Sequence, residues 1–151
     1  MQPVVFSQVS RLLLVLHGLT AMALLGASTH LVVVKVQRWR GNARARLEVT
    51  YSRLLAWLFL PTYALGLFLY PHFRINVRLR GLDAETPWAS NLFDFKEHLV
   101  SLGLPMVLAL YFLAKRGPGV RVANDVLAVA LWLMVVWGAI SGLIVTGVRG
   151  I

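Results

Sequence analysis

Four long runs without a charged residue constrain what this chain can fold into. They lie between Arg11 and Lys35, Arg53 and Arg74, Glu97 and Lys115, and Asp125 and Arg149. Each run approaches the roughly 20 residues that an α-helix needs to cross about 30 Å of hydrocarbon. A water-soluble domain could not hide these runs, because 58% of the residues are hydrophobic and only 14% are charged. The sequence therefore predicts an integral membrane protein.

Helices rather than strands are expected in these runs, since a membrane strand requires a closed barrel and alternating side chains. Segments such as 12–16 and 131–136 do not alternate. We predict an all-α, four-helix transmembrane bundle that forms a single membrane domain over residues 1–151. The expected spans are about 11–36, 52–72, 92–115 and 122–148. Pro61 and Pro105 are expected to kink the second and third spans.

The first run is interpreted as a span of the mature protein rather than as a cleavable signal peptide. It is longer than a signal core, and no basic residue precedes Arg11. The chain also contains no cysteine. Disulfides, thiolate metal sites and covalently attached c-type haem are therefore excluded.

The basic residues predict the orientation of the bundle. Nine lie in the connections after the first and third spans: Lys35, Arg38, Arg40, Arg44, Arg46, Arg53, Lys115, Arg116 and Arg121. Six lie on the other side: Arg11, Arg74, Arg78, Arg80, Lys96 and Arg149. The positive-inside rule then places the nine in the cytoplasm and both termini outside a bacterial inner membrane. We expect the basic stretch 35–53 to contact anionic lipid rather than nucleic acid, because it adjoins a span.

The longest connection, about 73–91, is too short to fold as a domain of its own. Apolar and polar residues alternate from Phe73 to Arg80, which predicts a short extended piece at the membrane surface. Trp88 is expected to anchor this piece at the interface. Since no soluble domain is evident, we expect the chain to be non-catalytic alone and to work with other membrane-complex subunits.

Histidines within the spans are the candidate functional residues, because ionisable groups inside a membrane are costly and usually functional. His17, His72 and His98 come from three spans and are expected at similar depth near the outer face. Two imidazoles from facing helices can supply both axial ligands of a b-type haem iron. We predict haem b between His17 and His98, with His17 and His72 as the second choice. His30 lies about 140° from His17 around its helix, so only one haem is expected.

Three arginines, Arg74, Arg78 and Arg80, follow on the outer side and are expected to bind the haem propionates. Gly18 and Gly103, near the two preferred ligands, are expected to leave room for a flat macrocycle. The arrangement resembles membrane b-type cytochromes in general, in which histidines on different helices of a four-helix bundle carry haem. That resemblance implies electron transfer.

Alternatives to haem stay open. Asp94, Glu97 and His98 share one helix face and, with His72, suit a zinc, manganese or iron ion. The histidines can also pack helices together or line a site for quinone. The predicted function is a cytochrome b-like electron-transfer subunit of a larger respiratory or redox complex. The alternative is a cofactor-free accessory subunit that anchors or stabilises such a complex.

Overall fold

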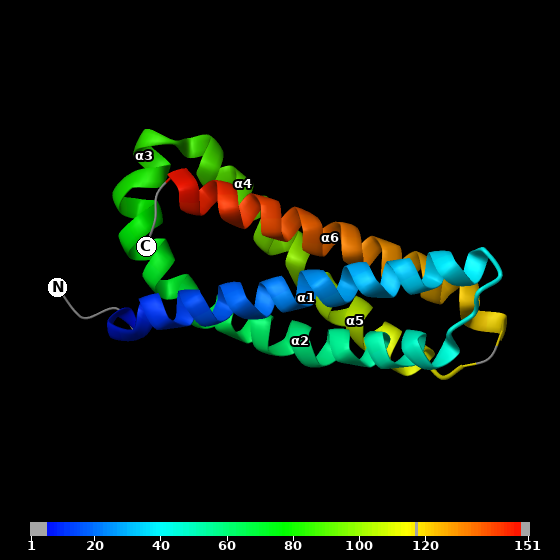
Figure 1. Ribbon diagram of the computed structural model, residues 1–151. Helices are drawn as coiled ribbons and strands as arrows, with labels where there is room; N and C mark the ends of the chain where they lie inside the picture. Colours follow the sequence, from blue (N-terminus) through cyan, green and yellow to red (C-terminus); the bar gives the residue numbers. More distant parts are fainter. Residues whose placement is uncertain (1–5, 117, 149–151) are drawn as a thin grey trace.

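The computed structural model describes residues 6–116 and 118–148, which form helices and no strand. Four helical segments are long and apolar enough to cross a membrane: Ser7–Trp39, Ala45–Glu85, Pro87–Leu113 and Arg121–Val148. They run alternately up and down the molecule (Figure 1). The first segment therefore begins at the same end of the bundle as the last one ends. The prediction of an all-α chain with four helices able to span a membrane is confirmed for the described residues.

The first two spans are continuous helices. After a 3₁₀ turn, η1, at Ser7–Val9, helix α1 covers Ser10–Trp39, and α2 covers Ala45–His72. α2 begins earlier than predicted because its polar first turns pack against the end of α1, where Glu48 forms an ion pair with α1. The helix continues through Pro61 without interruption.

The third span consists of two helices, α4 at Pro87–Ser101 and α5 at Gly103–Leu113. Pro105 explains the break, because it has no backbone N–H to donate to the carbonyl of Ser101 four residues earlier. The predicted disturbance at this proline is confirmed. The last span, α6, covers Arg121–Val148 and follows a 3₁₀ turn, η3, at Pro118–Val120.

The connection between the second and third spans is helical, so the prediction of an extended piece is wrong. α2 continues as a π-helix, η2, at Phe73–Leu82, which is followed by one α-helical turn, α3, at Asp83–Glu85. The buried residues of η2 are Phe73, Val77, Gly81 and Leu82. This spacing of four to five fits the wide i→i+5 turn of a π-helix. The apolar residues Ile75 and Leu79, which completed the alternation in the sequence, are exposed.

The helices are splayed at the end of the bundle that carries η2 and α3, here called the η2 end. α1 packs along α2 and α6, whereas α4 packs on α6 and has little contact with α1 or α2. In Figure 1, α4 and α6 accordingly diverge from α1 and α2 toward this end. At the opposite end, here called the η3 end, α5 fills the space between α2 and α6. Fully buried leucines such as Leu31, Leu55, Leu110 and Leu131 belong to the core.

Reporter fusions can establish which side of the membrane each end faces. From the bias in basic residues, a fusion after Gly81, in η2, is expected to be external. A fusion after Gly117, which lies just outside the described residues, is expected to be cytoplasmic. The opposite pair of results would place the η2 end in the cytoplasm. Arg149, counted on the outer side, also lies outside the described residues.

Candidate functional site

A cavity lies between all four spanning helices in the splayed part of the bundle. It contains about 90 Å³ of free space, several times the ~10–15 Å³ that one water molecule needs. Most of its wall is apolar and includes Leu24, Phe59, Val100 and Met134. Its polar lining residues are His17, Thr62, Tyr63, Lys96 and Glu97. The cavity therefore brings one of the predicted ligands together with polar groups from α2 and α4.

His17 is held by a hydrogen bond between α1 and α2. Its Nδ1 lies 2.9 Å from the carbonyl oxygen of Thr62. Because a carbonyl only accepts, Nδ1 is the protonated nitrogen of the neutral ring, and Nε2 is left as an acceptor. Gly66 allows this approach, since a Cβ there would lie 3.3 Å from His17 Cε1. The half-buried ring thus has one nitrogen fixed and the other available to a ligand.

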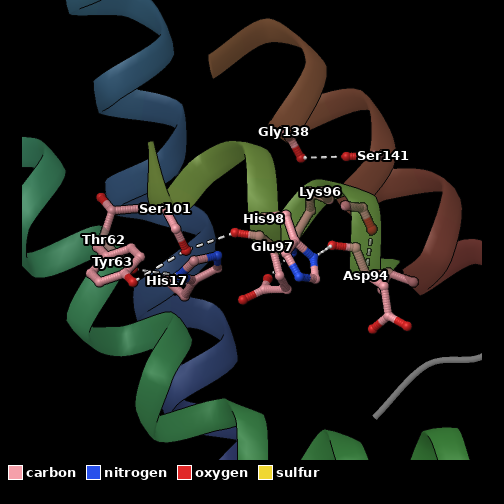
Figure 2. A network of polar contacts seen from close by, with 12 residues as sticks. His17, Thr62, Tyr63, Asp94, Lys96, Glu97, His98, Ser101, Gly138 and Ser141 are labelled. Atoms are coloured by element: carbon pink, nitrogen blue, oxygen red, sulfur yellow. Dashed lines mark hydrogen bonds and ion pairs between the residues drawn. The ribbon is translucent and has the colours of Figure 1, made fainter. Parts of the chain in front are cut away.

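Lys96 and Glu97 provide the polar part of the opposite wall, on α4. Lys96 Nζ lies 3.0 Å from Glu97 Oε1 and 4.6 Å from the centre of the Phe93 ring, within the range of a cation–π contact. At the rim, Tyr63 Oη of α2 lies 3.4 Å from Ser101 Oγ of α4 (Figure 2). This long contact is a weak bridge between the two walls.

His98 follows Glu97 in α4, but it does not line the cavity. Its side chain is exposed, and its Nδ1 lies 2.7 Å from the carbonyl oxygen of Asp94 in the same helix (Figure 2). The carboxylate of Glu97 is the neighbouring group that reaches the cavity. His17 and His98 are therefore not gathered around the same cavity, and their pairing on a haem stays a prediction.

The other two histidines also lie away from the cavity. His72, at the end of α2, has its Nδ1 3.2 Å from Asn76 Nδ2 in η2. His30 is exposed, bonds the Gly26 carbonyl oxygen at 3.0 Å and stacks on Tyr51. Across the described part of the chain, no three His, Cys, Asp or Glu side chains are grouped to hold a metal ion. The described residues therefore do not form a ready site for the metal ion considered as an alternative to haem.

Arg78 is engaged in a structural clamp. Its guanidinium donates two hydrogen bonds to the Asp94 carboxylate, at 2.6 and 2.8 Å, and one to Asp83 at 3.1 Å. These bonds tie η2 and α3 to α4. Arg74 and Arg80 are exposed. Propionate binding by the three arginines stays a prediction, and at Arg78 it would compete with the clamp.

The room expected beside Gly103 is filled by neighbouring side chains. A Cβ at this position would overlap Met134 Cε and would lie 2.6 Å from Phe59 Cζ. Gly18 has no such neighbour within 4 Å. Gly103 therefore allows α5 to pack closely on α2 and α6. The expectation that it makes room for a macrocycle is wrong.

A buried ion-pair network at the η3 end was not predicted. Lys35 is 0% exposed, and its Nζ lies 2.9 Å from Asp125 Oδ1 and 3.7 Å from Glu48 Oε2. Arg38 pairs with the same two acids, at 2.9 Å from Glu48 and 2.5 Å from Asp125, and Trp39 Nε1 lies 3.0 Å from Asp125. The network joins α1, α2 and α6. Lipid contact is therefore the wrong expectation for Lys35, which is fully buried. Arg38 is partly exposed, and lipid contact there stays a prediction.

Comparisons with known proteins found no matching family model, no similar curated protein and no similar solved structure. The description of this protein therefore rests on its fold and its cavity alone. The described residues form four helical segments able to span a membrane, with a cavity lined by His17 in the half of the bundle toward η2.

Proposed function

We propose that the chain is a membrane-embedded electron-transfer subunit of a larger redox complex in a bacterial inner membrane, with the cavity at the η2 end as its functional site. The observation that carries the proposal is the placement of ionisable groups on two walls of a largely apolar cavity. His17 lies on one wall, and Lys96 and Glu97 lie on another. Ionisable groups between membrane helices are costly and are usually retained for ligand or proton binding.

Open glycine positions support the assignment to a larger complex. Gly18, Gly26 and Gly142 have no neighbouring atoms within 4 Å of where a Cβ would be. Small residues of this kind let another membrane helix approach closely. The same observation favours the second candidate function, a cofactor-free accessory subunit that stabilises a membrane complex. The two candidates differ in whether the cavity holds a redox-active ligand.

Haem b is the cofactor suggested by the orientation of two histidines. In both His17 and His98, Nδ1 bonds a backbone carbonyl, which leaves Nε2 for a metal, as in many ligating histidines. As the side chains lie, only His17 reaches the cavity. The residues present therefore fit one axial ligand. His98 would have to turn inward to provide the second, and the helices would have to open further to admit a macrocycle into the space of about 90 Å³.

A reduced-minus-oxidised absorption spectrum of the full-length protein, purified from cells with ample haem, tests this cofactor. A bis-histidine haem is expected to show a Soret band and a low-spin spectrum, which His98→Ala removes or shifts because one strong nitrogen ligand is lost. His30→Ala is the matched control and should leave the spectrum unchanged. If His72→Ala removes the spectrum and His98→Ala does not, the assignment of His98 as a ligand is wrong. A wild-type protein without a Soret band contradicts the haem prediction.

A further inference from the structure

We infer that the cavity at the η2 end binds the head group of a quinol, the reduced form of a lipid-soluble quinone, in preference to the oxidised form. The inference rests on the proposed function of this cavity, and it names the class of ligand. Three features support it. They are the hydrogen-bonding groups that face the free space, the apolar wall around them, and an opening that a molecule dissolved in the membrane can reach.

Two of the polar side chains that line the cavity, His17 and Glu97, present hydrogen-bond acceptors, alongside the donors of Tyr63 and Lys96. His17 Nε2 is an acceptor because Nδ1 carries the proton that is donated to the Thr62 carbonyl. Glu97 offers a second acceptor from α4, since Lys96 Nζ occupies Oε1 at 3.0 Å and leaves Oε2 without a donor among the described residues. A ring that carries two opposed hydroxyl groups can donate to both acceptors. A quinone has only carbonyl oxygens and cannot donate to either.

Lys96 is the cationic donor on this wall, and one of its three N–H groups is directed at Glu97. Its ammonium group lies between Glu97 and the face of Phe93, and 15% of its side chain is exposed. It partly neutralises the carboxylate, which would otherwise be costly beside hydrocarbon. The wall therefore presents a compensated carboxylate, a suitable acceptor for a neutral hydroxyl donor.

Apolar and small residues form the inner part of the space that a ring would occupy. Phe59 and Met134 close the cavity toward the core, whereas Gly66 and Gly138 contribute no side chain. The free space of about 90 Å³ is smaller than the ~150 Å³ of a closed cavity that holds benzene. A ring therefore has to extend into the open side, where α4 has little contact with α2. A macrocycle of several rings requires far more room.

The open side suits a ligand that arrives from the bilayer. Leu67 of α2 lines the cavity and is 52% exposed, and Leu102, at the break between α4 and α5, is 60% exposed. In a bilayer such side chains contact acyl chains. A quinol with an apolar tail can thus insert its head while the tail stays among the lipids, so it never has to enter water.

Binding measurements on the full-length protein in nanodiscs, under anaerobic conditions, test the inference. The probes are a decyl-tailed benzoquinol, the corresponding quinone and the quinol dimethyl ether, which has the same ring but no hydroxyl donor. We expect the quinol to bind about tenfold more tightly than either of the others, the effect of roughly one hydrogen bond. Equal affinity for the quinol and its dimethyl ether would overturn the inference.

Two variants locate the site. His17→Phe keeps the volume of the ring and removes its nitrogens, and Glu97→Leu removes the second acceptor from an independent helix. Each is expected to weaken quinol binding about tenfold while the helical circular dichroism stays that of the wild type. His30→Phe, at an exposed position nearer the η3 end of α1, is the matched control and should bind quinol normally. Wild-type affinity in both His17→Phe and Glu97→Leu would show that the quinol binds elsewhere.

The haem spectrum distinguishes the failure of this inference from that of the proposed function. Suppose that the protein has a Soret band that disappears in His17→Phe, but does not bind quinol. The proposed function as a redox subunit would then stand, and the inference of a quinol site would be rejected. A protein with neither haem nor quinol binding would reject both and favour the accessory subunit. Saturable quinol binding that depends on His17 in a haem-free protein would support both the quinol site and the proposed role as a redox subunit.

Discussion

Asp125→Ala is expected to destabilise the protein by about 3–5 kcal/mol, the range for breaking a buried ion pair from one side. The Asp125 carboxylate accepts hydrogen bonds from Lys35, Arg38 and Trp39. Without it, the fully buried Lys35 ammonium retains Glu48 at 3.7 Å as its ion-pair partner. The free energy of unfolding can be measured by titrating the protein from a mild detergent into sodium dodecyl sulfate.

A double substitution is the control for this prediction. Lys35→Met with Asp125→Leu replaces both charges by apolar side chains and leaves Arg38 paired with Glu48. This variant should recover most of the lost stability, because a buried ion pair is often no more stabilising than a well-packed apolar pair. If Asp125→Ala alone stays within about 0.5 kcal/mol of the wild type, the network is solvated rather than buried.

Gly103→Ala is expected to destabilise the protein by about 1–3 kcal/mol, the usual range for overpacking a core. The new Cβ would overlap Met134 Cε and lie 2.6 Å from Phe59 Cζ. The tip of Met134 can rotate away, but the ring of Phe59 is stiff and buried, with 2% exposure. The same unfolding titration measures the effect.

Gly142→Ala provides the matched control, since it changes another helical glycine where no atom lies within 4 Å. It should be neutral or slightly stabilising, because alanine favours a helix more than glycine does. Adding Phe59→Leu to Gly103→Ala should recover part of the loss. Equal effects of alanine at Gly103 and Gly142 would contradict the close packing of α5 described above.

The spans could be predicted because their requirement is local: a helix that crosses hydrocarbon needs an unbroken length of uncharged sequence. The break near Pro105 is local too, since it follows from a missing backbone donor. The shape of η2 could not be predicted in the same way. Its wide turn brings Arg78 to Asp94, sixteen residues further along the chain. The alternation of apolar and polar residues within 73–80 does not predict that contact.

The sequence allows the depth of a residue along a helix to be estimated, but not the direction in which its side chain points. The distance of a residue from a helix end indicates how far it lies in the bundle, so His17 and His98 were expected at one level. Each residue turns a helix by about 100°, and the direction of each side chain depends on packing between helices. That rotation brings Glu97 rather than His98 to the cavity. It also determines the hydrogen bond between His17 and the Thr62 carbonyl oxygen, which no sequence motif predicts.

The ion-pair network illustrates a signal that the sequence did contain. Lys35 lies at the end of the first run and Asp125 at the start of the last, so both were placed at the same end of the bundle. Depth alone therefore allowed the two charges to meet. Whether Lys35 faced lipid or protein depended on the rotation of α1, which the sequence pattern left undetermined.

The apolar core between the two ends acts as an electrical insulator. Leu31, Leu55 and Leu131 are fully buried between the level of His17 and that of Lys35, and they can neither carry nor relay a proton. A proton released in the cavity would meet this leucine layer on its way to the η3 end, so we expect it to exchange with the aqueous phase at the η2 end. Any redox reaction in this cavity would acidify or alkalise a single compartment. The orientation of the chain in its membrane would then determine whether that reaction builds a proton gradient or dissipates one.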